Sequence, residues 1–226
     1  MLAYGKNVLL MTEPQKIKKV YLSKTRKDEE VMTFLKTHKI HFVLSDNVVL
    51  NKMTSGNHQG IVFEIEDFEY QHISSLYETS FVVLLDHLED PHNFGAIIRS
   101  CEAAGVDGII IPKDRSVSVN DTVLKTSVGC VDHIKIIRVS NMVDAIKKLQ
   151  EHDFFVYGTD MDGKDIKTVD FSSKRAVVIG NEGKGISQLV EKNCDEIISI
   201  PMVGSVNSLN ASVAAGIVIF KMGGLS

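Results

Sequence analysis

Residues 81–104 read FVVLLDHLEDPHNFGAIIRSCEAA, in which five apolar residues lead through an acidic turn into a segment of helical length. Further apolar runs follow along the chain, each separated from the next by enough residues for a helix. Short apolar strands that alternate with helices are typical of a parallel α/β sheet. The predicted strands are Phe81–Leu85, Gly108–Ile111, Ile134–Ile137, Phe154–Tyr157, Ala176–Ile179 and Glu196–Ile200.

Four helices are predicted between and after these strands, and Ser140 or Asn141 would cap the second of them. Ligands of parallel sheets bind outside the carboxyl ends of the strands. We therefore expect functional residues in the loops after Leu85, Ile179 and Ile200. The predicted helices are Gly95–Ala104, Met142–Gln150, Ile186–Asn193 and Leu209–Met222.

The first third of the chain has a less regular pattern, which predicts a small α/β domain. We expect this domain to cover residues 1–68, a linker without clear periodicity to cover 69–79, and the larger α/β domain to cover 80–226. In the small domain the predicted elements are strands at Ile17–Leu22, His41–Leu44 and Gly60–Glu66 and one amphipathic helix at Glu29–Thr37.

Charge is distributed unevenly between these two parts. Residues 1–40 hold nine Lys and Arg against four Asp and Glu, a net charge of +5 that leaves −9 for the remainder, because the whole chain carries −4. The asymmetry indicates a basic module attached to an acidic body, although a solvated lysine-rich helix face would produce the same count.

The composition disfavours several classes of protein. The longest apolar stretches are far shorter than the roughly 20 residues of a bilayer-spanning helix, and the short N-terminal apolar run lacks a cleavage site, so we expect a cytoplasmic protein. Cys101, Cys130 and Cys194 form no CxxC pair and are expected to be buried free thiols. His87 and His92 lie around Pro91 without a helical i,i+4 register, so no metal site is predicted.

Polar and glycine residues gather in three of the expected loops. The first, residues 86–100, places Arg99 inside an otherwise apolar helix, where a salt bridge to a neighbouring acid is the ordinary expectation. The second, VIGNEGKGIS at 178–187, is a glycine-rich turn that matches neither GxxxxGK[ST] nor GxGxxG. The third, IPMVGSVNSLNASVAAG at 200–216, places small polar residues at the start of a small-residue helix.

Together, and in this order, the loops resemble the three signature motifs of the SpoU (TrmH-like) family of SPOUT RNA 2′-O-ribose methyltransferases. The first motif holds Asn93 and Arg99, the second is Gly180–Gly183, and the third ends in Ser208-Leu209-Asn210. Residues 4–8 (YGKNV) and 58–61 (HQGI) are similar to the family's auxiliary RNA-binding domain, which has an L30e/L7Ae-like fold. The resemblance covers essentially the whole chain and is greatest to the branch that methylates a guanosine of large-subunit (23S) ribosomal RNA.

This resemblance implies a fold, a cofactor and partners. The C-terminal sheet would contain a deep trefoil knot, a rare exception to unknotted folds, and the knot would bind S-adenosylmethionine. The chain would be a homodimer through its C-terminal domain and would bind structured RNA. The implied cofactor-binding residues are Thr159, Gly180, Asn181, Ile200, Met202, Ser208 and Leu209.

The same resemblance implies that Asn93, Arg99, Glu182 and Asn210 are the catalytic residues. Methyl transfer to a ribose hydroxyl requires alignment of that hydroxyl and removal of its proton. A guanidinium, with a pKa above about 12, is hardly ever a base. Arg99 would therefore either be deprotonated by an unusual environment or, in the version we favour, orient the substrate phosphate and ribose while another group accepts the proton. Asn93 would hold the target nucleotide, Glu182 would bond Arg99 or the substrate, and Asn210 would fix the cofactor loop.

Three alternatives remain open at this point. An RNA-binding protein could keep the fold without catalysis, and the chain could be an unrelated nucleotide-binding enzyme of Rossmann or flavodoxin type. The acidic turn Asp86–Pro91 stands where such an enzyme has its phosphate loop, which disfavours the second. Within the family, transfer RNA or a ribosomal adenosine could replace the guanosine.

Overall fold

The computed structural model describes residues 1–54, 56–205 and 208–224 and separates the chain into two compact units. The first unit combines Met1–Glu69 with Ser118–Asp132, and the second combines Tyr70–Val117 with His133–Ser226. Nothing in the periodicity of the sequence indicated that residues 118–132 pack with the N-terminal residues.

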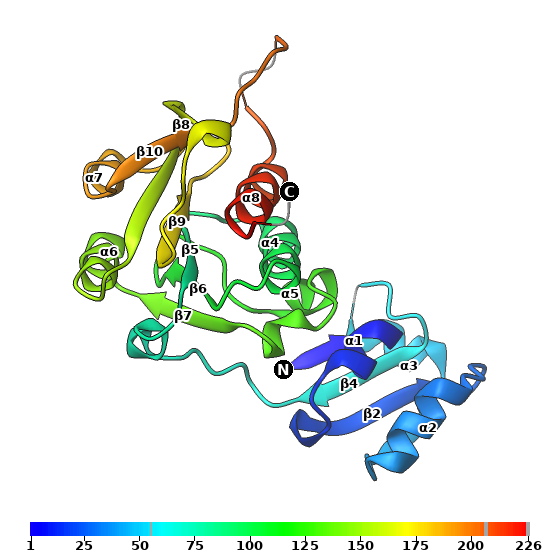
Figure 1. Ribbon diagram of the computed structural model, residues 1–226. Helices are drawn as coiled ribbons and strands as arrows, with labels where there is room; N and C mark the ends of the chain where they lie inside the picture. Colours follow the sequence, from blue (N-terminus) through cyan, green and yellow to red (C-terminus); the bar gives the residue numbers. More distant parts are fainter. Residues whose placement is uncertain (55, 206–207, 225–226) are drawn as a thin grey trace. The chain divides into compact units, whose positions relative to one another are not determined.

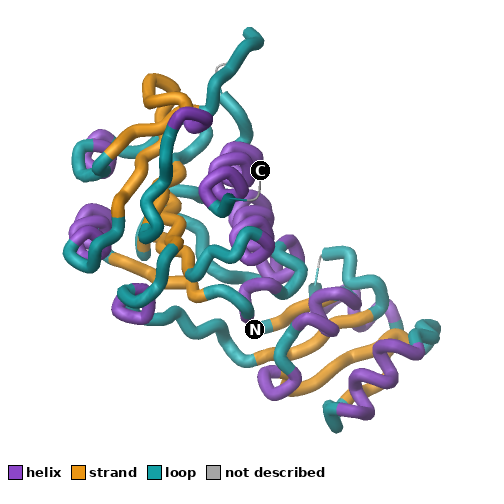
Figure 2. Tube along the Cα trace, viewed as in Figure 1, coloured by secondary structure: helices purple, strands orange, loops and turns teal. Residues whose placement is uncertain are grey.

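A four-stranded sheet with the order β1-β4-β2-β3 forms the first unit (Figures 1 and 2). In it β4 is antiparallel to β1 and β2, and β3 is parallel to β2. The strands are β1 (Leu2–Tyr4), β2 (Ile17–Ser23), β3 (Phe42–Ser45) and β4 (Ile61–Ile65), and the helices are α1 (Lys6–Met11), α2 (Glu29–Thr37), α3 (Asn47–Met53) and α5 (Asp121–Thr126).

The second unit contains a six-stranded sheet with the order β10-β8-β9-β5-β6-β7. Every neighbouring pair in it is parallel, which confirms the predicted parallel α/β class. The strands are β5 (Phe81–Leu85), β6 (Gly108–Pro112), β7 (Lys135–Val139), β8 (Phe155–Asp165), β9 (Arg175–Ile179) and β10 (Glu196–Ser199).

Helices cover both faces of this sheet, with α4 and α8 on one side and α6 and α7 on the other (Figure 1). Asn141, not Ser140, caps α6, because its side chain accepts from the backbone N–H of Val143 at 2.9 Å. The helices are α4 (Pro91–Ala103), α6 (Met142–Gln150), α7 (Gln188–Glu191) and α8 (Ala211–Met222). Among the helices of the described ranges, none has the length and apolar character to cross a bilayer.

Burial explains why the sequence of β5 is continuously apolar. All five of its residues are buried, because β5 pairs on both sides and is covered on both faces. The side chains of Val82 and Leu84 share one core cluster with Ile146 and Leu149 of α6. Ile73 and Leu76, from a short 3₁₀-helix (Ile73–Leu76) within the expected linker, belong to the same cluster.

The order of strands positions a site. From β5 the chain builds β6 and β7 on one side, whereas β9, β8 and β10 lie on the other. The side on which the chain adds successive strands therefore changes between β5 and β9. Open α/β sheets bind ligands at such a point. The trefoil knot stays a prediction, because strand order alone does not define how the chain is threaded.

Candidate functional site

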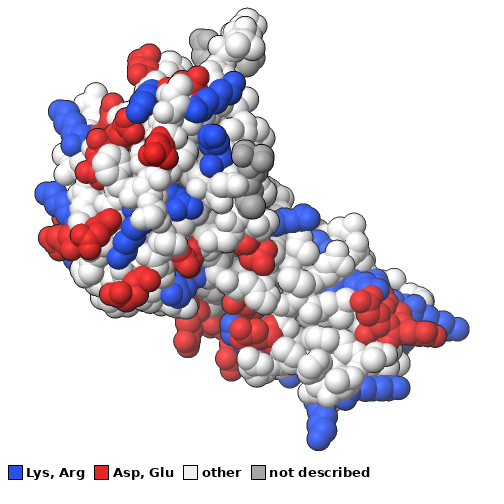
Figure 3. Space-filling model, viewed as in Figure 1, with Lys and Arg blue, Asp and Glu red and all other residues white. Residues whose placement is uncertain are grey.

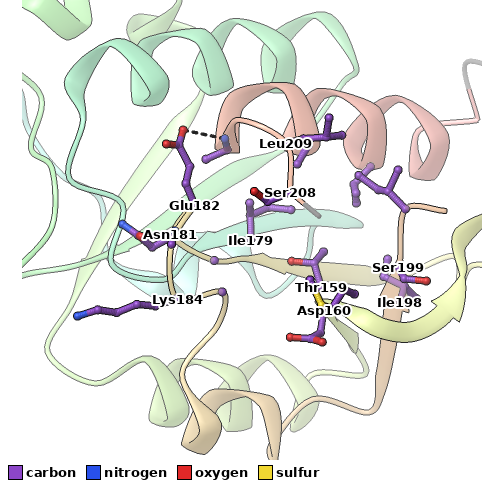
Figure 4. Close-up of a pocket in the computed structure, with 18 of the residues that line it drawn as sticks. Thr159, Asp160, Ile179, Asn181, Glu182, Lys184, Ile198, Ser199, Ser208 and Leu209 are labelled. Carbon is purple, nitrogen blue, oxygen red and sulfur yellow. Dashed lines mark hydrogen bonds between the residues drawn. The ribbon is translucent and has the colours of Figure 1, made fainter. Parts of the chain in front are cut away.

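A cavity of about 610 Å³ lies in the second unit, at the carboxyl ends of β9 and β10. Its remaining walls come from β8, beyond the last pairing of β8 with β9, and from the first turns of α8. Figure 4 shows side chains from these elements around the cavity. Its lining includes Thr159, Gly180, Asn181, Ile200, Met202, Ser208 and Leu209, which are the seven residues expected to bind a cofactor.

The turn after β9 has its shape because glycine occupies both ends. A Cβ on Gly180 would lie 2.1 Å from the carbonyl carbon of Gly185, and Gly185 itself has a φ of +65°. Backbone hydrogen bonds between Asn181 and Gly185 close the turn in both directions, at 3.1 and 2.8 Å. The compact turn brings its backbone to the edge of the cavity.

Apolar and acidic groups line different parts of the cavity. Ile179, Ile198 and Val218 are among the apolar lining residues, and Asp160 and Asp162 bring carboxylates. Figure 4 shows Lys184 extending away from the other labelled side chains. A ligand with one apolar, planar part and one polar, cationic part suits this arrangement.

Beside the cavity, three side chains from separate segments form what we term the Asn–Glu–Asn cluster, made of Asn93, Glu182 and Asn210. Oε1 of Glu182 accepts from Nδ2 of Asn93 at 2.8 Å and from Nδ2 of Asn210 at 2.6 Å. Nδ2 of Asn210 also donates to Oδ1 of Asn93 at 3.0 Å. All three sequence motifs therefore meet here, one residue from the start of α8.

The cluster also begins α8. Oδ1 of Asn210 accepts from the backbone N–H groups of Ser212 and Val213, and Oε1 of Glu182 accepts from that of Ala211 at 2.9 Å (dashed in Figure 4). A carboxylate at a helix N-terminus is favoured by the helix dipole. Asn210 thus stands between α8 and the Ser208-Leu209 segment, and its role in fixing the cofactor loop stays a prediction.

Arg99 does not join the cluster. Its side chain is exposed on α4 and is absent from the lining of the cavity. Neither the salt bridge expected from periodicity nor a hydrogen bond to Glu182 forms among the described residues. The guanidinium is consequently available to a partner from outside.

Some lining residues were not anticipated from the sequence. Asp160, Met161 and Asp162 lie on β8, which continues to Asp165 rather than ending at Tyr157. Ile198 and Ser199 of β10 also line the cavity. The rule that ligands bind at strand carboxyl ends also points to residues 160–162, because the predicted strand at 154–157 ends shortly before them.

The cysteines lie mostly in the interior, and one histidine is paired with a carboxylate. Cys101 and Cys130 are buried and form no disulfide, and Cys194 is partly buried; burial raises the pKa of Cys194 to about 12. Within the described ranges no three or more His, Cys, Asp or Glu residues are grouped so that they could hold a metal ion. His87 instead pairs with Asp86, with Nδ1 and Oδ1 2.7 Å apart.

Two known proteins match this chain over nearly its whole length. A protein of Bacillus subtilis (strain 168), named as belonging to the TrmH family of tRNA/rRNA methyltransferases, is 37% identical over 96% of this chain and 93% of its own. The AdoMet-bound rRNA methyltransferase from Sinorhizobium meliloti has a TM-score of 0.81 and 26% identity, covering 98% of this chain and 85% of its own.

A third match is limited to part of the chain. The A. aeolicus TrmH/SpoU tRNA modifying enzyme has a TM-score of 0.58 and 27% identity, covering 67% of this chain and 80% of its own. Two family descriptions also match: "RNA 2′-O ribose methyltransferase substrate binding" over residues 2–71, and "SpoU rRNA Methylase family" over residues 80–220. The protein is therefore a member of the SpoU family of RNA methyltransferases, with that family's substrate-binding domain at its N-terminus.

Proposed function

We propose that the protein transfers a methyl group from S-adenosylmethionine to the ribose 2′-hydroxyl of a guanosine in large-subunit (23S) ribosomal RNA. The SpoU family consists of S-adenosylmethionine-dependent RNA methyltransferases, so the finer part of the proposal is the target. The observation that supports methyl transfer at this site is the convergence of Asn93, Glu182 and Asn210, one from each motif, beside a single cavity.

The lining of the cavity suits the cofactor. Apolar side chains such as Ile179, Ile198 and Val218 can cover an adenine, and the carboxylates of Asp160 and Asp162 can accept hydrogen bonds from ribose hydroxyls or an ammonium group. When bound, S-adenosylmethionine supplies an electrophilic methyl group on a sulfonium. The compact backbone around Gly180 would hold it by main-chain contacts.

The chain's own residues then have separate tasks. The Asn–Glu–Asn cluster holds the start of α8 and the Ser208-Leu209 segment against the cavity, because one carboxylate oxygen joins three donors. Arg99, exposed and unpaired among the described residues, orients the phosphate and ribose of the RNA through its planar fork of donors. Asn93 holds the target nucleotide next to this cluster.

Ribosomal RNA is favoured over transfer RNA by the extent of the matches. The structure named as an rRNA methyltransferase corresponds to 98% of this chain, whereas the structure named as a tRNA modifying enzyme corresponds to 67%. The substrate-binding family description matches residues 2–71, and in our division this domain is residues 1–68, joined to the methyltransferase domain at 80–226 by the linker at 69–79. An RNA-binding protein without catalysis is disfavoured because the cluster is complete.

Charges in the first unit support a role in RNA binding. Four of its basic residues are engaged in ion pairs with acids of the same unit: Lys6, Lys16, Lys24 and Arg26. Others have no ion pair among the described residues and remain for phosphates: Lys18, Lys27, Lys36 and Lys39. On the face drawn in Figure 3 both signs are interspersed, so contacts at separate points are expected rather than one basic patch.

A homodimer in the cytoplasm completes the proposal. Val213, Ile217 and Phe220 lie four and three residues apart on α8, so they share one helical face, and they are 51%, 42% and 37% exposed. A contiguous apolar stripe on a helix indicates an interface. We take this stripe as part of the dimer contact.

The test is transfer of labelled methyl from S-adenosylmethionine to total RNA from a strain that lacks this gene, followed by separation of the RNA and identification of the nucleoside. Label as 2′-O-methylguanosine in the large ribosomal RNA is the expected result. Label in transfer RNA would overturn the target and keep the chemistry. Absence of label from both free RNA and assembling ribosomal particles would overturn the proposal.

A further inference from the structure

A second cavity, of about 580 Å³, lies in the same unit and shares no lining residue with the first. It lies at the carboxyl ends of β5, β6 and β7, where His87, Arg115 and Asn141 follow the respective strands. A parallel sheet binds ligands at this edge. None of the functions assigned above uses this cavity.

Only one turn of chain separates the two cavities. Residues 180–185 line the first cavity, and Ser187, two residues later, lines the second. Nδ2 of Asn181 donates to the carbonyl oxygen of His87 at 3.2 Å, and the backbone N–H of Ser187 donates to Oδ2 of Asp86 at 2.8 Å. A polymer that places one residue at the first cavity therefore has a neighbouring residue within reach of the second.

Two basic residues of the second cavity are held in an unusual backbone conformation. His87 has a φ of 57° and Arg115 a φ of 51°, in the left-handed region that non-glycine residues seldom adopt. Residues in sparsely populated regions cost about 1–3 kcal/mol each and cluster at ligand sites. Four other described non-glycine residues also have a positive φ, but His87 and Arg115 are the two of this set that line either cavity.

A buried carboxylate fixes the orientation of His87. Asp86 is 1% exposed and accepts from Ser187 through Oδ2 while Oδ1 pairs with Nδ1 of His87. In the tautomer in which Nδ1 donates to this carboxylate, Nε2 is left for a ligand. Arg115 is exposed and makes no hydrogen bond or ion pair within the described ranges, so all its donors remain available.

The remaining lining shows which chemical class would fit. Pro112, Met142 and Leu189 bring apolar surface, and Leu189 is 64% exposed. The carboxylate of Asp114 is an acceptor for amide or amino groups at the edge of a base, and Arg115 can stack on a base or bind its phosphate. Two carboxylates, Asp86 and Asp114, stand against the single guanidinium of Arg115, so the cavity suits the uncharged edge of a base better than a bare anion.

We propose that the second cavity binds an unpaired nucleotide of the RNA substrate that neighbours the methylated one, with Arg115 and His87 as its binding residues. This inference rests on the proposed function and names part of the substrate: RNA in which the target region is single-stranded. Proteins recognise such unstacked bases by stacking and by hydrogen bonds to their edges. The cavity would thereby contribute to the choice of target.

The first test compares Arg115→Asn with Lys113→Asn, using total RNA from a strain lacking the gene. Asparagine tolerates the left-handed conformation, so the first variant removes the guanidinium without new strain. Lys113 is exposed in the same segment but does not line the cavity. We expect Arg115→Asn to raise KM for RNA about tenfold, which corresponds to a loss of about 1.4 kcal/mol of binding free energy. Its kcat and its affinity for the cofactor should not change. Lys113→Asn should change KM by less than about twofold. Equal effects of the two variants would overturn the inference.

A second test works even if the wild-type protein transfers no methyl group. Each nucleoside 5′-monophosphate is titrated into the full-length protein saturated with S-adenosylhomocysteine, and backbone amide NMR signals are followed. Shifts at Arg115, Asn141 and Ser187 that disappear in Arg115→Asn are expected. In an active protein the KM comparison decides the inference. In an inactive protein, the absence of these shifts up to about 10 mM nucleotide would contradict it, because a Kd above that concentration is weaker than that of any specific subsite.

Discussion

Arg99 lies exposed on α4 with no partner among the described residues, so its contribution depends on what it binds. We expect Arg99→Lys to lower kcat/KM for RNA at least about tenfold, because an ammonium is a point charge and cannot replace the bidentate fork. Cofactor affinity should not change, since Arg99 does not line the cavity. Single-turnover methyl transfer with saturating cofactor measures the effect, and retention of most activity would exclude the orienting role.

Glu182 acts through a single oxygen that accepts three hydrogen bonds. Glu182→Ala leaves two amides and one backbone N–H without this partner, and we expect the free energy of unfolding to fall by about 1–2 kcal/mol and kcat to fall at least about tenfold. Glu182→Gln keeps an accepting oxygen and should have an intermediate effect. Unchanged turnover of the alanine variant with RNA and cofactor both saturating would remove Glu182 from the site.

The turn after β9 offers a matched pair of glycines. A Cβ on Gly180 would overlap the backbone of Gly185 at 2.1 Å, whereas a Cβ on Gly183 would meet only Oδ1 of Asn181, at 3.7 Å. Gly180→Ala must therefore open the turn, and we expect the Kd for S-adenosylmethionine to rise at least about tenfold. Gly183→Ala should change it by less than about twofold. Calorimetric titration checks both, and equal affinities would show that the turn does not shape the cofactor site.

At the scale of elements, α2 and α3 both begin after an aspartate, but the two carboxylates differ. Oδ1 of Asp28 accepts from the backbone N–H of Val31, whereas Asp46 makes no such bond at α3. Burial raises the pKa of Asp28, but hydrogen bonds from Arg26 and Lys6 outweigh it and lower that pKa from 3.8 to about 2. Asp28 therefore stabilises the folded state above about pH 4, and this contribution is lost as the pH falls towards 2.

Asp28→Asn isolates this charge, because asparagine still caps a helix. At pH 7 we expect it to lower the free energy of unfolding of the first unit by about 1 kcal/mol, allowing for solvent screening of a partly exposed ion pair. The difference should vanish near pH 2. Asp46→Asn, at an exposed ion pair, should cost less than about 0.5 kcal/mol. Urea unfolding followed at NMR signals of Val20 and Leu35 measures both, and a constant difference down to pH 2 would contradict the assignment.

Elements differ in how far the sequence predicted them. β5 was predictable because burial on both faces makes it wholly apolar. α6 was predictable because its nine residues are long enough to show a helical period of apolar residues and Asn141 provides an N-cap. The helices α1, α3 and α5 have only six or seven residues, too few to show a helical period, and all three were missed. The polar end of β8 was missed because Thr159–Asp165 has no strand pattern; its backbone is held by pairing with β10.

The candidate site was also predictable only in part from the sequence. Glycines and asparagines at strand ends marked the loops, but their roles came from the order of three motifs rather than from any one loop. Joining Asn93 to Glu182 and Asn210, 89 residues and more apart, requires the tertiary fold. Local periodicity contains no information about such contacts, so the second cavity could not be anticipated, whereas Asp160 follows a predicted strand end and was open to the rule on strand carboxyl ends.

At the scale of the whole molecule, the apolar stripe on α8 predicts the state of assembly. Ile217 stands at the centre of the stripe between Val213 and Phe220. A charge there would be buried without a partner in a dimer, so we expect Ile217→Glu to yield a monomer at micromolar concentration in sedimentation equilibrium. Val48→Glu, which changes a 67% exposed side chain of α3 in the first unit, should leave the dimer intact. If the wild-type chain is itself a monomer, or if both variants remain dimeric, the stripe is not the interface, and the exposed apolar face of α8 must serve another contact.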